Sequence, residues 1–215
     1  MEELKNPFLF WSVLIIANLL MYVVNMVISF WWSQTKHLKS LKVTGLDVKT
    51  SVITLVINII IAIPGYYLFS INKIMFTNHY FVRDLLLLII AFDFAMYGLH
   101  YLSHIMWPLN IIHKNHHAHK YFNEFSLYVM HPMEAVFFGT LLTLFTYLFF
   151  FNMYSFLVFI FFNYLYGVIA HLNIRSPKQP MVFGNSTFHA EHHEKSNCNY
   201  GFYTVIWDKL FKTNS

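Results

Sequence analysis

Histidines are the residues whose type and spacing most clearly suggest chemistry in this chain. Eleven of the thirteen lie between residues 100 and 193, where the sequence reads HYLSH at 100–104, HKNHH at 113–117, a single histidine at 171 and HAEHH at 189–193. On a helix, residues four apart project from one face, and the imidazoles of an HxxHH triplet spread over roughly 100° of it. The nine candidate ligands are His100, His104, His113, His116, His117, His171, His189, His192 and His193.

Nine clustered imidazoles exceed what one metal ion needs. Neutral imidazole suits zinc, copper and iron, and a mononuclear site takes about three or four such ligands. The count therefore predicts two metal ions, and the same nine residues are the candidate catalytic residues. We interpret the isolated His37, His79 and His119 as interfacial or hydrogen-bonded side chains instead.

Spacing also excludes several competing metal chemistries. The HExxH motif of zincin proteases is absent. The HAE at 189–191 matches the HxE of zinc deaminases, but no PCxxC completes that site. No glutamate has a histidine three residues later, as carboxylate-bridged di-iron bundles require. The single cysteine, Cys198, excludes a disulfide framework and cysteine-ligated metals. A histidine-only dinuclear centre remains.

The elements that must position these histidines have the composition of membrane helices. Apolar residues make up 57% of the chain and charged residues 11%, against about 25% in soluble domains. Residues 7–32 and 50–72 carry no charge, and the uncharged stretch 135–170 is long enough for two spans with a break near Asn152. We therefore expect helices over 7–32, 50–72 and 83–106, and a helical hairpin over 134–170.

The distribution of cations predicts how these spans are oriented. If the spans alternate, loop 33–49, residues 107–133 and tail 171–215 lie on one side, together with the histidines. That side carries 11 of the 14 Lys and Arg residues, so the positive-inside rule makes it the cytoplasm. A pI near 9.0 then reflects cytoplasmic loops, and we expect no nucleic-acid partner. The predicted fold is an all-α, integral membrane bundle of four to five spans with a cytoplasmic histidine-rich di-metal cap.

Side chains that support the histidines can be predicted from helical geometry. Asp93, Tyr97, His100 and His104 follow one continuous face of the helix 83–106. A carboxylate in a membrane helix is costly unless paired, so we expect Asp93 to accept an imidazole N–H, with a salt bridge as the alternative. Glu134 is a similar candidate, or else a solvated acid.

The carboxy-terminal tail is expected to lie at the membrane surface. Its aromatic residues and lysines between Phe202 and Lys212 predict an amphipathic helix at the lipid headgroups. This helix either covers the metal site, lines a lipid entrance or serves only as an anchor.

Several motifs beyond the histidines resemble those of the membrane fatty acid hydroxylase and sterol desaturase superfamily. They are the DFAMYGLH stretch at 93–100, the HPME stretch at 131–134, the NYG at 199–201 and the WDKLFKT at 207–213. In the last, Lys212 stands where the family usually has glycine. The resemblance extends from about residue 85 to 213.

The resemblance implies an enzyme with two iron ions that uses dioxygen to hydroxylate or desaturate a membrane lipid, such as a fatty acyl chain or a sterol. It also implies an electron donor of the ferredoxin or cytochrome type, because the chain contains no haem or Rossmann motif of its own. Zinc can replace iron on purification, since imidazole binds both metals. We expect a two-helix membrane anchor over 1–82, retained after synthesis, and a catalytic domain over 83–215.

The resemblance also implies how the ligands are divided. One ion is assigned His100, His113, His116, His189 and His192, and the other His104, His117, His171 and His193. The second set is one ligand short of the family's fullest pattern. A water, Asn173 or His131 could complete it, and we favour His131, the alternative being that it caps a helix begun by Pro132.

Two other functions compete with this interpretation. A carotenoid hydroxylase of the same superfamily is disfavoured because the HDGLVH-type motif is missing. A membrane protein that binds or transports metal could also use clustered histidines, but transporters place polar ligands near the middle of the bilayer. The histidines here are predicted at one surface.

Overall fold

The computed structural model describes residues 2–36, 40–114, 116–118, 122–174 and 181–215. Within these ranges the fold is entirely helical, apart from two isolated bridges that join Thr77 to Asn152 and Phe183 to Thr204. The elements are η1 (Glu2–Lys5), α1 (Pro7–Lys36), α2 (Gly45–Ile60), α3 (Ala62–Ser70), α4 (Phe81–Ile105), α5 (Leu109–His113), η2 (His116–Ala118), α6 (Pro132–Leu148), α7 (Met153–Ala170), α8 (Ser186–Lys195) and α9 (Ile206–Phe211). The predicted all-α bundle is confirmed.

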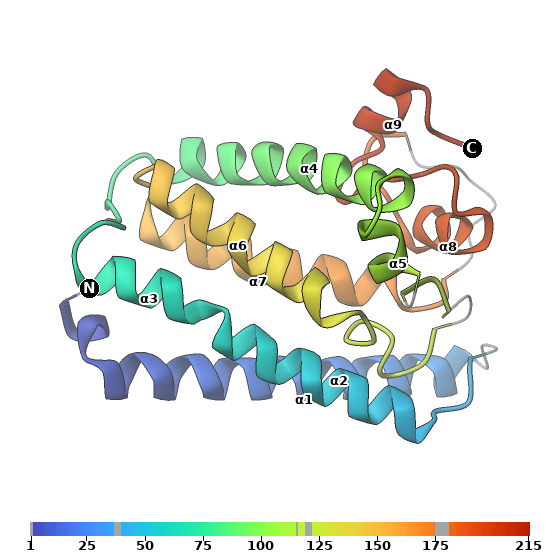
Figure 1. Ribbon diagram of the computed structural model, residues 1–215, viewed down its shortest axis with the longest axis horizontal. Helices are drawn as coiled ribbons and strands as arrows, with labels where there is room; N and C mark the ends of the chain where they lie inside the picture. Colours follow the sequence, from blue (N-terminus) through green and yellow to red (C-terminus); the bar gives the residue numbers. More distant parts are fainter. Residues whose placement is uncertain (1, 37–39, 115, 119–121, 175–180) are drawn as a thin grey trace.

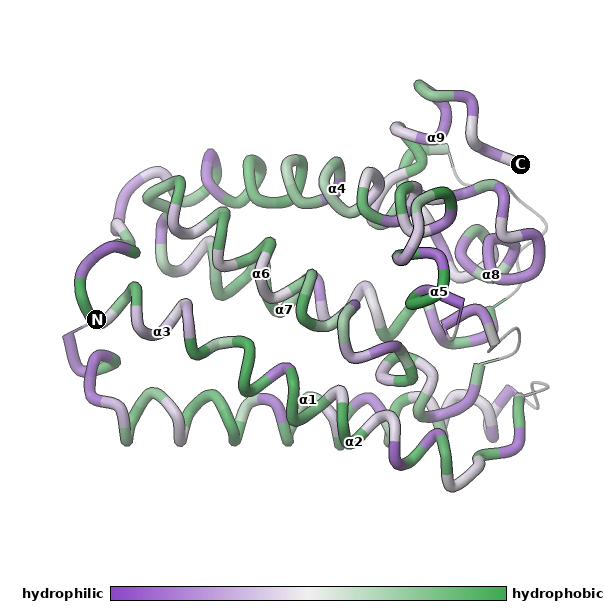
Figure 2. Tube along the Cα trace, in the orientation of Figure 1, coloured by the Kyte–Doolittle hydropathy of each residue, from purple (hydrophilic) through white to green (hydrophobic). Residues whose placement is uncertain are grey.

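Four helical segments of the described chain are long and apolar enough to cross a membrane: α1, the α2–α3 pair, α4 and α7. The 17-residue α6 is apolar but shorter. All of them run along the long axis of the molecule, with α1 at the bottom, α4 at the top and α6 and α7 between them (Figure 1). Hydrophobic residues colour the helices along most of their length (Figure 2). The chain is an integral membrane protein.

Local sequence signals explain where the spans begin and break. Asn152 caps α7 by accepting a hydrogen bond from the Ser155 backbone N–H (3.1 Å), which confirms the predicted break in the hairpin. The expected single helix over 50–72 is instead α2 followed by α3, interrupted at Ile61. Pro64 lies in the first turn of α3, and because proline has no N–H, it cannot complete the ladder across the break.

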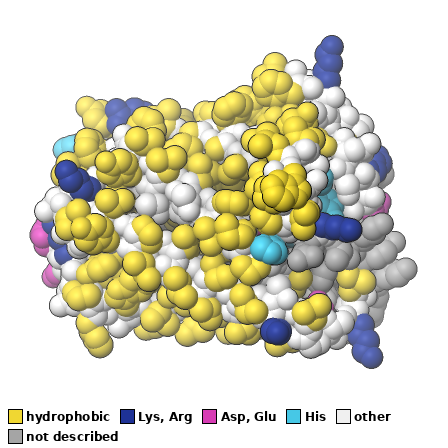
Figure 3. Space-filling model, in the orientation of Figure 1, with side chains coloured by type: hydrophobic (Ala, Val, Ile, Leu, Met, Phe, Trp, Pro, Cys, Tyr) yellow, Lys and Arg dark blue, Asp and Glu magenta, His cyan; other side chains and the backbone are white. Residues whose placement is uncertain are grey.

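The core lies where α4, α6 and α7 meet the carboxy-terminal segment. Its fully buried centre comprises Leu88, Phe92, Phe159 and Tyr203. Outside this centre the usual distribution of soluble proteins is reversed, because large hydrophobic side chains cover the middle of the surface and charged side chains gather toward the two ends (Figure 3). A hydrocarbon environment makes such a surface stable.

The carboxy-terminal segment differs from the predicted amphipathic helix. Only Ile206–Phe211 is helical, and Tyr203 is fully buried in the core, where its hydroxyl donates to Asn163 Oδ1 at 2.6 Å. The backbone N–H groups of Tyr203 and Thr204 donate to the Asp93 carboxylate (2.7 and 3.1 Å) instead of entering a helical ladder. The helical prediction is therefore wrong for residues 202–205.

Of the three isolated histidines, the structure describes only His79. His79 is exposed and lies in the segment between α3 and α4, which is at the end of the molecule opposite α8 (Figure 1). The predictions for His37 and His119 fall outside the described residues.

Candidate metal centre

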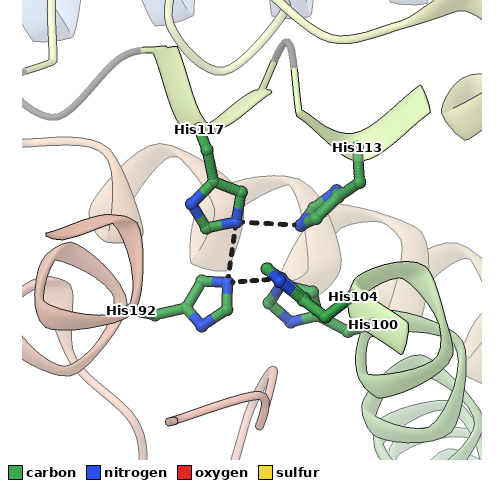
Figure 4. Close-up of side chains that lie close together, drawn as sticks. All are labelled: His100, His104, His113, His117 and His192. Atoms are coloured by element: carbon green, nitrogen blue, oxygen red, sulfur yellow. Dashed lines mark hydrogen bonds between the residues drawn. The ribbon is translucent and has the colours of Figure 1, made fainter. Parts of the chain in front are cut away.

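The nine candidate ligands converge at one end of the bundle, where α4 ends and α5, η2 and α8 lie. They form two groups in which the potential ligand atoms all lie within 4.8 Å of one another. The five-histidine cluster contains His100, His104, His113, His117 and His192 (Figure 4). The four-histidine cluster contains His116, His171, His189 and His193. The clusters adjoin, because the ring centroids of His117 and His193 are 4.8 Å apart.

Helical geometry explains part of this division. Residues four apart project from one face of an α-helix, and the two such pairs on α4 and α8 stay together: His100 with His104, and His189 with His193. Neighbouring residues point about 100° apart on an α-helix, so His192 and His193 of α8 enter different clusters.

The grouping of ligand atoms by distance differs from the division that the family resemblance implied. That division placed His104 and His117 with the second ion, and His116 and His189 with the first. The structure exchanges both pairs between the clusters. The implied division separated residues four apart, which the turns of α4 and α8 hold together.

Close nitrogen–nitrogen distances suit two imidazoles that bind one ion. The Nε2 atom of His117 is 3.1 Å from that of His113 and 3.0 Å from that of His192, whose Nε2 is 3.2 Å from that of His104 (Figure 4). In the four-histidine cluster, the Nε2 atoms of His189 and His193 are 3.1 Å apart. Two nitrogens bound at about 2.1 Å and about 90° apart lie about 3.0 Å from each other.

Outer hydrogen bonds fix the tautomer of four of these rings. In each ring, Nδ1 faces an oxygen outside the clusters that accepts a hydrogen bond. The pairs are His100 with the Tyr200 carbonyl (2.9 Å), His192 with the Cys198 carbonyl (2.7 Å), His113 with Glu134 Oε1 (2.6 Å) and His171 with the Gly167 carbonyl (2.8 Å). A carbonyl or carboxylate oxygen only accepts, so Nδ1 carries the proton and Nε2 presents a lone pair. Metal-binding histidines are oriented in this way.

The inward-facing lone pairs fit a cation better than they fit one another. Among the described residues, the buried Nε2 atom of His100 has no hydrogen-bond partner. The Nε2 lone pairs of His113 and His192 both face Nε2 of His117, which has at most one proton to share. A positive ion would satisfy all of these groups, so the residues fit a bound metal.

The electrostatics of the site favour the neutral form of five of the imidazoles. Burial, followed by the neighbouring His113 and His104, lowers the pKa of His117 to about 3. Burial also holds the pKa values of four other histidines well below their usual range, with nearby histidines adding to the effect. These four are His116, His189, His192 and His193. Neutral imidazole is the form that binds metals.

The face of α4 that carries His100 and His104 packs along the carboxy-terminal segment. Asp93 was expected to accept an imidazole N–H, but its carboxylate instead accepts from Thr204 Oγ1 (2.6 Å) and Trp207 Nε1 (3.0 Å), besides two backbone N–H groups. The Tyr97 hydroxyl lies 3.1 Å from Thr213 Oγ1. Asp93 and Tyr97 therefore hold the segment that supplies the Tyr200 carbonyl to His100.

Asp208 is itself part of the carboxy-terminal segment and stabilises it through internal hydrogen bonds. Sequence analysis did not identify Asp208 as a supporting residue. Its fully buried carboxylate accepts from the backbone N–H groups of Tyr200 (2.8 Å) and Gly201 (2.6 Å) and from Thr213 Oγ1 (2.7 Å). A Cβ at Gly201 would collide with the Thr204 carbonyl oxygen. The sequence signal for this role was the Asp208 carboxylate in the Trp-Asp pair of the 207–213 motif, shortly after Gly201.

The other supporting candidates have distinct positions. Glu134 contacts His113, as described above, and its second oxygen accepts from the His131 backbone N–H (2.8 Å). His131 caps α6, with Nδ1 accepting from the Met133 N–H (3.2 Å), and it lies in neither cluster. Asn173 bonds the backbone of Phe122 through both side-chain polar atoms (2.8 and 2.6 Å). The structure thus places His131 as the helix cap, which was our alternative to a tenth ligand.

The fold and the site together define a class: helical membrane proteins with histidine clusters able to hold two metal ions. Comparison with known proteins identifies the family within that class. The family model described as fatty acid hydroxylase matches residues 85–213, and the chain belongs to this family.

Sterol desaturases are among the similar curated proteins. The chain is 26% identical to the Delta(7)-sterol 5(6)-desaturase of Candida glabrata, over 96% of this chain and 60% of the relative. It is 31% identical to that of Eremothecium gossypii, over 59% and 36%, and 25% identical to that of Saccharomyces cerevisiae, over 93% and 58%. The chain thus spans at most about three-fifths of the length of these relatives. No solved structure matches the chain.

Proposed function

We propose that this protein oxidises a C–H bond of a membrane lipid with dioxygen, by hydroxylation or desaturation, at two iron ions held by the nine histidines. The observation that carries this proposal is the convergence of two all-imidazole clusters whose Nε2 lone pairs point inward, at the end of an apolar helix bundle. Membership of the fatty acid hydroxylase family supports lipid as the substrate class.

Each part of the site has a role in this reaction. When bound, the irons would couple oxidation of an unactivated C–H bond to reduction of dioxygen, with the lipid and an external donor each supplying two electrons. The nine imidazoles hold the ions, while Glu134 and the carbonyls of Cys198, Tyr200 and Gly167 keep four of the rings in the binding tautomer. The surrounding helices keep the lipid in an apolar environment.

A sterol is the substrate that we favour, and desaturation the favoured outcome. The support is that the relatives matching most of this chain are Delta(7)-sterol 5(6)-desaturases. A fatty acyl or related lipid remains the alternative, and both are covered by the experiment below.

We further propose that the site faces the cytoplasm and receives electrons from a separate ferredoxin or cytochrome-type protein. Seven of the described cations belong to segments at the histidine end: the end of α1, the segment from there into α2, the residue after α5, the end of α8, and α9 with the residue after it (Figure 1). They are Lys36, Lys42, Lys49, Lys114, Lys195, Lys209 and Lys212. Lys5 in η1, Lys73 between α3 and α4, and Arg83 at the start of α4 belong to segments at the opposite end. The positive-inside rule supports this orientation. The division into an anchor over 1–82 and a catalytic domain over 83–215 is part of the same proposal.

Comparative lipid analysis tests the proposed function. Cells expressing the chain should contain a lipid that has gained one oxygen atom or lost two hydrogen atoms, and its formation should require dioxygen and reductant. A His104→Ala variant that still inserts into membranes should not form it. If the purified protein instead moves metal ions across proteoliposomes and no lipid is altered, the transport alternative replaces ours.

A further inference from the structure

An apolar pocket lies directly against the five-histidine cluster. It measures about 110 Å³ and is bounded by Leu99 and Ser103 of α4, Leu109 and Ile112 of α5, and Phe137 of α6. The side chains of His113 and Glu134 complete its wall. His113, a candidate metal ligand of the five-histidine cluster, therefore forms one side of the pocket. No member of the four-histidine cluster lines the pocket.

The polar groups in the pocket wall already have partners. Glu134 accepts from His113 and from the His131 backbone, and the Nε2 atom of His113 faces His117. The Ser103 hydroxyl donates to the His100 carbonyl at 2.6 Å. A polar headgroup placed here would gain no free partner, so the pocket favours hydrocarbon.

The surface beside the pocket is apolar and exposed. Within three positions of the lining residues in sequence are Trp107, which is 77% exposed, and Ile111, which is 61% exposed, together with Ile105, Met106 and Met133. Tryptophan is enriched where membrane proteins meet the headgroup region. In Figure 3, hydrophobic side chains continue across the molecule to the histidine end. Lipid is thus the natural neighbour of this side of the bundle.

The pocket is too small for a whole lipid. Sites that enclose a drug-sized ligand measure about 300–1,000 Å³, several times more than this pocket. Only a segment of an acyl chain or one edge of a sterol fits, and the remainder of the molecule stays in the bilayer.

We propose that this pocket binds a hydrocarbon segment of a membrane lipid, which enters sideways from the bilayer between α4, α5 and α6 and reaches the metal centre beside His113. The inference rests on the proposed function and deepens it, because it assigns the reacting segment of the substrate to the five-histidine cluster.

A spectroscopic binding experiment tests the pocket without turnover. The protein is loaded with paramagnetic Co²⁺ or diamagnetic Zn²⁺, since imidazole binds both, and placed in phosphatidylcholine nanodiscs. The nanodiscs contain a trace of either phosphatidylcholine with a fluorinated palmitoyl chain or a fluorinated sterol. Broadening of the fluorine resonance by the Co²⁺ protein, and not by the Zn²⁺ protein, is expected for at least one probe. The probe that responds shows whether the segment is acyl or sterol.

Two pocket-filling variants and one matched control locate the effect. Leu109→Trp should weaken probe binding by about tenfold, because the larger side chain fills the space that the probe would occupy. The smaller change Leu99→Phe should act in the same direction and serves if Leu109→Trp does not fold. Leu86→Trp, at an exposed position near the start of α4 and away from the pocket, should bind the probe like the unaltered protein. Full Co²⁺ content shows that each variant has folded.

The outcomes separate this pocket from the proposed function. The proposed lipid binding is disproved if the Co²⁺ protein broadens the fluorine resonance of neither probe. It is also disproved if folded Leu109→Trp and Leu99→Phe proteins broaden that resonance as much as the unaltered protein does. If the probe binds and the variants displace it but no lipid is ever oxidised, the pocket stands and the proposed function fails. If both variants oxidise lipid at the full rate, the pocket is wrong and the function stands.

Discussion

Two outer contacts of the five-histidine cluster, those of His100 and His113, join residues far apart in the chain. The contact of His192 with Cys198 is local, as is the one that orients His171 in the four-histidine cluster. His100 and His192 donate to carbonyls of residues 200 and 198, and His113 donates to Glu134 of α6. His171 donates to Gly167, one turn earlier in its own helix. The first cluster therefore depends on how the tail and α6 pack, while His171 is oriented by the end of α7 itself.

This difference predicts which substitutions affect one ion and which affect both. Changes in the carboxy-terminal segment or at Glu134 should weaken the ion of the five-histidine cluster and spare the other. Metal content and two-step metal titration of the purified protein distinguish these cases.

The largest effect is expected from removing a ligand of either cluster. His104→Ala and His193→Ala should each lower the metal content from two ions to one, because each takes a nitrogen from a different cluster. Lipid oxidation should fall below detection in both, while membrane insertion is unchanged. Elemental analysis and product analysis check this result. Full activity in either variant would contradict the assignment of that residue.

Acid should destabilise the metal-free protein through both clusters. The pKa of His117 is lowered to about 3, and those of His116, His189, His192 and His193 also lie well below 6.5. Below about pH 6.5 the unfolded chain binds protons that the folded chain does not. The free energy of unfolding should therefore be constant above that pH and fall below it, by up to about 1.4 kcal/mol per pH unit for each such imidazole.

Denaturant unfolding in detergent after chelation measures this pH dependence. His117→Gln should show a smaller slope below about pH 6.5, since it removes one buried group whose protonation folding prevents. A free energy of unfolding that does not change between about pH 6.5 and 5 would show that these imidazoles are not kept neutral.

Glu134→Gln should affect only the five-histidine cluster. The variant keeps the size of the side chain but removes the charge that faces His113 Nδ1 at 2.6 Å. Loss of such an outer partner lowers metal affinity by about 10–100-fold. Glu3→Gln, an exposed acid at the opposite end of the molecule, is the matched control. An equal loss at both steps of the metal titration would refute the separation of the clusters.

The sequence predicted the features that depend on local pattern. Charge-free stretches predicted the spans, and Asn152 predicted the break in the hairpin because its side chain caps α7. Part of the grouping of the histidines also follows from local geometry. The rule that residues four apart share a helix face keeps His100 with His104 and His189 with His193, whereas the family-based division separates each of these pairs.

Features that depend on which backbone groups meet a given side chain were beyond sequence reasoning. Every residue has a carbonyl, so nothing in the letters Cys198 and Tyr200 marks them as acceptors for His192 and His100. Asp93 was recognised as a buried carboxylate that needs partners, but the partners are donors of the tail and not an imidazole. Which donor reaches it is decided by tertiary packing.

Asp208→Asn is expected to have the smallest effect and is the sharpest test of the dependence on the tail. The carboxylate now accepts from the N–H groups of Tyr200 and Gly201 through different oxygens (2.8 and 2.6 Å), so the amide would keep one acceptor and place its NH2 group against the other N–H. The Tyr200 carbonyl should then shift away from His100, which lowers affinity at the five-histidine cluster by about tenfold or less. Asp208 touches no histidine ring directly, so this loss would act through the backbone alone.

Two-step metal titration of Asp208→Asn decides the point, with Lys212→Gln as a control in the same segment. Weakening of one step shows that the tail orients His100 and His192 without supporting the four-histidine cluster. Equal weakening of both steps would mean that the tail stabilises the whole histidine end, and the contrast between distant and local support would then be lost. The clusters share the helix α8, which carries ligands of both, so a general loosening of α8 is the physical route by which that second result would arise.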